Sequence, residues 1–320
     1  MEHTLLEWSA FLAFVLAMLA LDLGVFNRKD HVVGPREALG WSVLWVSLAL
    51  TFGGWIWFRH GGELGLQYLT GYVIEKSLSV DNIFVFVVIF GALGIPPIYQ
   101  HRVLFWGILS ALVMRGAMIG AGAALLARFH WIIYVFGAFL VLTGVKLLLA
   151  RGAAEHPEES ALFRLLRRVV PASPNLDGNH FFTRVDGRWL ATPLFFALAL
   201  IEVTDVIFAV DSIPAIFAVT TDPFIVFTSN IFAILGLRSL YFLLAGFVEK
   251  FTYLKPSLAV VLLFVGAKMA LVDVVKIHAG VSLAVVLSIL AVGIVASILR
   301  NRRAPQVGAS PARPAQTEGA

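Results

Sequence analysis

Glu75-Lys-Ser-Leu-Ser-Val-Asp-Asn-Ile83 and Asp205-Val-Ile-Phe-Ala-Val-Asp-Ser-Ile213 are two copies of one acidic motif, and each lies in a long apolar stretch. Both read as an acid, four residues, Val-Asp, a small polar residue and Ile. An arginine follows each copy in the next apolar stretch, Arg115 after the first and Arg238 after the second. The order of these features indicates an internal duplication.

A third match closes each copy, with Gly144-Val-Lys146 answering Gly266-Ala-Lys268. The first repeat then covers about 66–150 and the second about 193–274, with three apolar stretches in each. Because three is odd, the second copy must enter a membrane from the opposite face. Inverted repeats of this kind place a substrate site near the midplane, where the copies meet.

The composition is that of a membrane protein. Of the 320 residues, 59% are hydrophobic and 14% are charged, with a mean hydropathy of +0.88, whereas soluble domains carry about 25% charged residues. A membrane-spanning helix needs roughly 20 apolar residues. We therefore predict an all-α polytopic membrane protein with about nine transmembrane helices and a three-plus-three inverted repeat. The expected spans are near 5–26, 40–58, 66–92, 103–126, 131–150, 193–218, 224–247, 258–274 and 278–299.

We expect one membrane domain over 1–300, a cytoplasmic loop at 151–192 and a disordered cytoplasmic tail at 301–320. Most Lys and Arg residues between spans lie in the odd-numbered connections and the tail. The positive-inside rule then places the N-terminus outside the inner (plasma) membrane and the C-terminus in the cytoplasm. Within the loop, 160–170 predicts a basic amphipathic helix suited to an anionic lipid surface, and 185–188 predicts a tight turn.

The acidic stretches suggest interrupted helices. Pro214 follows Asp211 by three residues and cannot donate to a helix ladder. Asp211 lies six positions after Asp205, which places the two acids about 240° apart on a straight helix. We expect a local unwinding that lets both acids face one cavity, with a straight helix and acids on two faces as the alternative.

Carboxylates deep in hydrocarbon cost roughly 2.5–3.5 kcal/mol each and must face one another, water or cations. Oxygen ligands without cysteine or histidine suit Mg²⁺, Mn²⁺ or Ca²⁺. The predicted metal ligands are Glu75, Asp81, Asn82, Glu202, Asp205, Asp211 and Ser212. The predicted charge-compensating residues are Arg115, Arg238, Lys146 and Lys268, and Asp22 and Thr204 are expected along the pathway.

A structural reading of the same residues stays open, in which the acids form ion pairs and Lys146 and Lys268 reach the interface with their long side chains. Buried acids and bases are nearly balanced in number. Binding a divalent ion would then displace a basic partner or release a proton, which gives proton antiport a physical route. The sequence contains no cysteine, no phosphate-binding loop and no convincing nucleophile and base. We expect no enzyme activity, no cofactor and no nucleic-acid partner, only membrane lipids and the transported ion.

Residues 202–241, from Glu-Val-Thr-Asp to Leu-Arg-Ser-Leu-Tyr, resemble the TerC integral membrane family. The stretch from Glu75 to Phe86 and Arg188-Trp-Leu-Ala-Thr-Pro-Leu194 look like that family's other signatures. The resemblance covers nearly all of residues 1–300. It implies a polytopic fold related to the LysE-type exporters, a historical link to tellurium resistance, and manganese efflux for some members.

Three functions follow from these observations. The first is export of a divalent cation, foremost Mn²⁺, through the paired acids. The second is transport of tellurite or another oxyanion bound by Arg115 and Arg238, which the excess of acids over bases disfavours. The third is a membrane scaffold in metal stress that transports nothing, in which the acidic motifs are structural.

Overall fold

The computed structural model describes residues 4–21, 33–129, 131–149, 161–185, 187–245, 253–274 and 277–303. Asp22 and the tail after Arg303 lie outside these residues. The backbone of Asp81 is described, but its side chain is not. The predictions made for Asp22, for the carboxylate of Asp81 and for the disorder of the tail therefore stay predictions.

The described chain is almost entirely helical. Its elements in order are α1 (Leu5–Leu21), α2 (Pro35–His60), α3 (Gly62–Ala92), α4 (Pro97–Arg128), α5 (Ile132–Leu149), α6 (Ala161–Val169), β1 (Phe182–Val185), β2 (Arg188–Ala191), α7 (Pro193–Phe217), α8 (Pro223–Leu235), α9 (Leu237–Leu244), α10 (Leu254–Ala270) and α11 (Ala279–Arg303). The all-α prediction holds for the spanning part, with the small hairpin β1–β2 as an addition.

Six helical segments of the described chain are long and apolar enough to cross a membrane: α2, α4, α5, α7, α8 with α9, and α11. The helix α3 has the necessary length, but Glu75, Lys76 and Asp81 interrupt its apolar sequence. The helices α1 and α10 are apolar and have 17 described residues each. The chain is thus a multi-pass membrane protein whose spanning part is helical.

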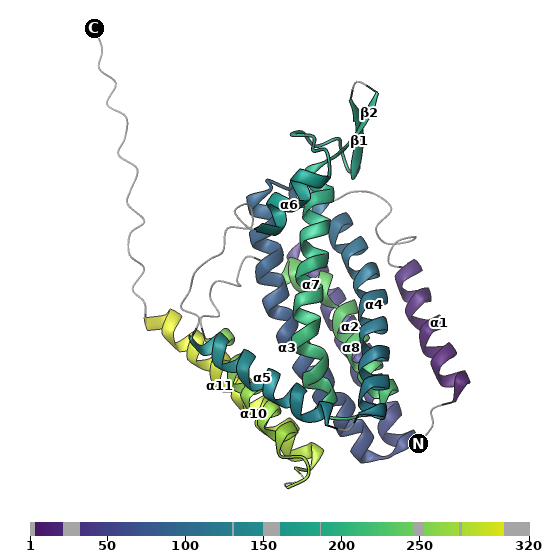
Figure 1. Ribbon diagram of the computed structural model, residues 1–320, viewed down its shortest axis with the longest axis vertical. Helices are drawn as coiled ribbons and strands as arrows, with labels where there is room; N and C mark the ends of the chain where they lie inside the picture. Colours follow the sequence, from purple (N-terminus) through teal and green to yellow (C-terminus); the bar gives the residue numbers. More distant parts are fainter. Residues whose placement is uncertain are drawn as a thin grey trace.

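The helices that carry the acidic motifs lie at the centre. In Figure 1, α3, α4, α7 and α8 run roughly side by side. Both α3 and α4 pack on α7 and on α8. The helices α5, α10 and α11 lie obliquely to this group, with α10 in contact with both α5 and α11. The helix α6 and the hairpin lie together at one end of the molecule.

Glycines allow α5 and α10 to cross very closely. A Cβ atom on Gly144 would lie 2.9 Å from the carbonyl oxygen of Ala259. A Cβ atom on Gly266 would lie 2.8 Å from the carbonyl oxygen of Gly137. Small residues commonly let helix backbones approach one another in membranes. These glycines therefore fix the crossing of the third helix of each predicted repeat.

The predicted unwinding at the acidic motifs is wrong. The helix α7 continues through Pro214 to Phe217, and α3 is continuous from Gly62 to Ala92. Pro214 cannot donate to the carbonyl of Val210, four residues earlier, but the helix continues past it to Phe217, and the carbonyl of Pro214 accepts from the N–H of Ala218 at 3.0 Å. The alternative of a straight helix is the observed one.

A helix interruption occurs instead inside the predicted span 224–247. Gly236 separates α8 from α9, and its N–H donates to the carbonyl of Ile234 rather than to one four residues back. The ammonium of Lys76, from α3, donates to the carbonyl oxygen of Ala233 at 3.2 Å. A half-buried lysine thus satisfies a carbonyl in the last turn of α8, as cations do at helix C-termini.

The loop before α7 folds as the sequence predicts. The helix α6 packs on α7 through Phe163 and Phe196, whose ring centroids are 6.0 Å apart. The strands β1 and β2 pair antiparallel, and Gly187 at the turn between them has φ 77°, a conformation that favours glycine. Both the amphipathic helix and the tight turn are therefore confirmed, while Asp186 lies outside the described residues.

Candidate functional site

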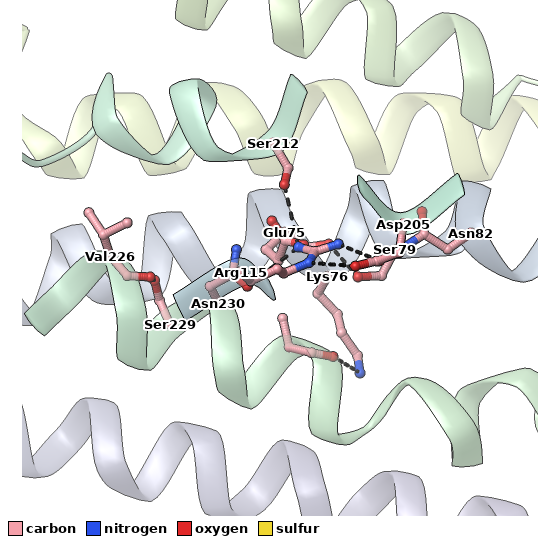
Figure 2. Close-up of polar contacts among 11 residues, drawn as sticks. Glu75, Lys76, Ser79, Asn82, Arg115, Asp205, Ser212, Val226, Ser229 and Asn230 are labelled. Carbon is pink, nitrogen blue, oxygen red and sulfur yellow. Dashed lines mark hydrogen bonds and ion pairs between the residues drawn. The ribbon is translucent and has the colours of Figure 1, made fainter. Parts of the chain in front are cut away.

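Arg115 of α4 lies at the centre of a buried polar cluster (Figure 2). Its side chain is 1% exposed, and its guanidinium forms ion pairs with the carboxylates of Glu75 and Asp205. The Nη2 atom donates to Asp205 Oδ1 at 2.8 Å and the Nε atom to Oδ2 at 3.2 Å. This two-point geometry fixes the guanidinium plane as well as its position.

The two carboxylates come from different copies of the acidic motif. Glu75 begins the first copy on α3, and Asp205 begins the second on α7. Both are nearly inaccessible to solvent, with side chains 1% and 7% exposed. Asn82, also from the first copy, donates from Nδ2 to Asp205 Oδ1 at 3.3 Å. The predicted convergence of the two motifs is thus realised for Glu75, Asn82 and Asp205.

Two neutral groups complete the surroundings of the guanidinium. The Nη1 atom of Arg115 donates to Ser212 Oγ and to Asn230 Oδ1, each at 3.4 Å. Ser212 was a predicted ligand, whereas Asn230 of α8 was not. One feature of the sequence could have indicated Asn230. It is a polar amide at the start of an apolar run, Ile-Phe-Ala-Ile-Leu235, within its helix.

Several polar atoms in and beside this cluster lack a partner in the described part of the chain. They include Oε2 of Glu75 and Nδ2 of Asn230, both fully buried. Buried polar groups are nearly always hydrogen-bonded, and an exception calls for a ligand, water or ion. The cluster therefore has a free carboxylate oxygen next to its only guanidinium among the described residues.

The other acids of α7 face different neighbours. Asp211 accepts from Thr143 Oγ1 of α5 at 3.2 Å, and Lys146 is close enough to interact with it electrostatically. Glu202 accepts from the hydroxyl of Ser110 on α4, and its second oxygen is buried with no partner among the described residues. The structure thus separates Asp211 from Asp205 and leaves Glu202 one turn away from the Arg115 cluster.

The remaining predicted residues do not join the cluster in the described part of the chain. Thr204 donates to the carbonyl of Leu200 within its own helix at 2.6 Å. Arg238 lines a small cavity with Glu37 and Trp45, between α2 and α9. Lys268 lines a separate cavity of about 620 Å³ with residues that include Glu63 and Asp222. Of the predicted basic residues, Arg115 is the one that the structure places on Glu75 and Asp205.

Comparison with known proteins identifies the family of this chain. The profile of the "Integral membrane protein TerC family" matches residues 60–305. The chain belongs to the TerC family. The matched part contains both acidic motifs, Arg115 and every helix from α3 to α11.

Relatives within the TerC family cover nearly the whole chain. A Myxococcus xanthus protein described as an uncharacterized membrane protein, STKORF319, is 67% identical over 298 residues, 93% of each chain. Proteins from Salmonella typhi and Escherichia coli K12 are 47% identical over 309 residues, covering 94% of this chain and 96% of their own. Both carry the provisional name of membrane-bound redox modulator Alx. No solved structure matches the chain.

The site of this TerC-family chain brings together side-chain oxygens from three helices, α3, α7 and α8. Among the described side chains, however, no group of three or more acids, histidines or cysteines is arranged to hold a metal ion. The cavity that adjoins Asp205 measures only about 10 Å³ and is lined mainly by apolar residues. The described atoms therefore form a closed cluster in which Arg115 occupies the space between the carboxylates.

Proposed function

We propose that this TerC-family protein exports a divalent metal cation, preferentially Mn²⁺, in exchange for protons. The observation that carries the proposal is the convergence of Glu75 and Asp205, the equivalent acids of the two motifs, on one buried guanidinium. Intramembrane acids that face the bundle interior commonly mark ion pathways. Asn82, Ser212 and Asn230 add neutral oxygens within the same cluster, and hard oxygen donors favour Mn²⁺ over copper or zinc.

The remaining predicted ligands belong to this proposal as parts of the route. Asp81, Glu202 and Asp211 lie on α3 and α7 within two turns of the cluster. Lys146 lies near Asp211, and Lys268 lines a cavity together with Glu63 and Asp222, both away from the cluster. A cation that passes these acids meets one carboxylate after another. We place Asp22 and Thr204 along the same route.

The nine spans and the inverted repeat are part of the proposal. Support comes from packing. If α3 corresponds to α7 and α4 corresponds to α8, a two-fold relation between the copies requires the contact of α3 with α8 to have an equivalent in the contact of α7 with α4. Both contacts are present. The glycines give a second indication. Gly144 faces Ala259, and Gly266 faces Gly137. The two contact positions of the first copy, 137 and 144, are separated by the same interval as those of the second copy, 259 and 266. An inverted repeat provides the two gates that alternating access needs.

We also propose that the protein lies in the inner membrane with the end that carries α6 and the hairpin in the cytoplasm. Five arginines at that end are exposed: Arg164, Arg167, Arg168, Arg184 and Arg188. Positively charged connections stay on the cytoplasmic side. The N-terminus then lies outside and the C-terminus inside.

The Alx relatives are named for redox modulation. This chain has no cysteine, so thiol chemistry of its own cannot supply such an activity. Control of the cellular level of a redox-active metal is compatible with that name. The oxyanion alternative is less well supported, because Arg115 is already paired with two carboxylates that would repel an anion.

The test is cellular manganese content and growth on added Mn²⁺ in cells that carry the wild type, Glu75→Gln or Asp205→Asn. Asp177→Asn, an exposed acid in the loop before α7, is the matched control. All variants are compared at equal abundance in the membrane. We expect the wild type and the control to lower cell manganese and the two site variants to lose this effect.

The scaffold alternative makes a different prediction. If the acids only hold the fold together, the site variants lose function in proportion to their loss from the membrane. Variants that remain at wild-type abundance and still lower manganese would contradict the exporter proposal.

A further inference from the structure

Arg115 fills the position between the two carboxylates where an ion would bind. It bonds Glu75 and both oxygens of Asp205 and is itself 1% exposed. The cavity beside Asp205 has a volume of about 10 Å³, about the space of one water molecule. A cation with even part of its hydration shell therefore cannot be added to this arrangement; it has to take the place of the guanidinium.

The balance of charges also excludes a divalent cation added beside the guanidinium. Among the described side chains of the cluster, Glu75 and Asp205 carry two negative charges and Arg115 carries one positive charge. A divalent cation in place of the guanidinium would balance the two carboxylates. A divalent cation added while the guanidinium still bonds both carboxylates would leave excess positive charge at their oxygens, where an uncompensated buried charge is strongly unfavourable.

The cluster also contains what an exchange requires. Glu75 Oε2 is buried without a partner in the described part of the chain, so one ligand atom is available before the guanidinium moves. The guanidinium has alternative acceptors, because its Nη1 atom already contacts Ser212 Oγ and Asn230 Oδ1 at the long distance of 3.4 Å. Movement of Arg115 away from Asp205, with these two neutral groups as its remaining acceptors, would uncover the carboxylate oxygens of Asp205 (Figure 2).

We propose that Arg115 is a tethered competitor of the transported ion. It holds Glu75 and Asp205 together while no ion is bound, and it moves toward Ser212 and Asn230 when a divalent cation takes its place. This inference rests on the proposed function and adds its mechanism of exchange. A competing cation that never leaves the protein compensates one of the two carboxylate charges while no metal ion is bound, and it weakens ion binding enough for release.

The test compares Mn²⁺ binding and Mn²⁺ flux in purified full-length protein. We expect Arg115→Gln to bind Mn²⁺ at least about tenfold more tightly than the wild type in detergent, because a unit charge near the ligands is gone. In proteoliposomes, net efflux by the same variant should fall at least about tenfold. Arg128→Gln, an exposed arginine at the end of the same helix, is the control and should leave the affinity within about twofold.

A second variant covers the case in which Arg115→Gln does not fold. Arg115→Lys keeps the positive charge, but one ammonium cannot reproduce the planar two-point bond to Asp205. Its Mn²⁺ affinity should therefore lie above that of the wild type. Unchanged or weaker binding in the folded Arg115 variants would overturn the inference. If the wild type transports Mn²⁺ in that case, the exporter proposal survives; if the wild type neither binds nor transports Mn²⁺, both fail.

Discussion

Glu75 and Asp205 bond the same guanidinium, although they lie on different helices and in different copies of the acidic motif. Their shared partner, Arg115, comes from a third helix. One buried side chain therefore ties α3, α4 and α7 together at the polar centre of the protein. Any change in this cluster is expected to affect both the packing of the three helices and the chemistry of the site.

Asp205→Asn should strongly destabilise the protein. The substitution removes one of two negative charges that compensate a fully buried arginine, and breaking one partner of a buried ion pair costs about 3–5 kcal/mol. We expect a clear fall in the thermal unfolding temperature of the purified protein in detergent.

Asp211→Asn is the matched comparison on the same helix. Asp211 is half-buried and its described hydrogen bond is the one from Thr143, so its loss should cost about 1 kcal/mol or less. Equal losses of stability for the two variants would show that the Arg115 cluster is not the structural centre described here.

Gly266→Ala should weaken the crossing of α5 and α10. The new methyl group would lie 2.8 Å from the carbonyl oxygen of Gly137 and 2.9 Å from the backbone N of Val141, and backbone atoms cannot turn away as a flexible side chain can. Overpacking of this kind costs about 1–3 kcal/mol, measurable as a lower unfolding temperature.

Gly120→Ala is the control for that substitution. A Cβ atom at Gly120 of α4 meets nothing within 4 Å. The change should be neutral or stabilise the helix by up to about 1 kcal/mol, since alanine has the higher helix propensity. A stabilising Gly266→Ala would contradict the close contact between α5 and α10.

Phe163→Ala should release α6 from α7. Phe163 is 8% exposed and packs on Phe196, whereas Leu165 on the same short helix is 58% exposed. Loss of the buried ring should cost about 3 kcal/mol of local docking energy, seen as faster amide hydrogen exchange in α6. Leu165→Ala should leave that exchange nearly unchanged, and a faster exchange in both variants would argue against docking through Phe163.

Part of this structure follows from local sequence patterns. Long apolar stretches give the membrane helices, the spacing of Phe163 and its neighbours gives α6, and the Asp-Gly pair before Arg188 gives the hairpin turn. The meeting of Glu75 with Asp205 on one guanidinium agrees with the prediction that the two copies of the acidic motif come together.

Other features depend on packing and could not be predicted. The helix α7 continues through Pro214 to Phe217, and the interruption falls instead at Gly236, where Lys76 satisfies a carbonyl of α8. The sequence also offers two equivalent arginines. Only the three-dimensional arrangement places Arg115, together with Asn230, on the carboxylates.

We propose above all that a divalent cation crosses the membrane by way of the carboxylates of Glu75 and Asp205. The most direct measurement is Mn²⁺ flux into proteoliposomes that contain purified wild-type protein, Glu75→Gln or Asp205→Asn, with folding of each variant checked before reconstitution. We predict Mn²⁺ flux with the wild type and at least a tenfold slower flux with each variant, about the loss of one strong charge interaction. Wild-type flux in both folded variants, or none in the wild type, would contradict the account.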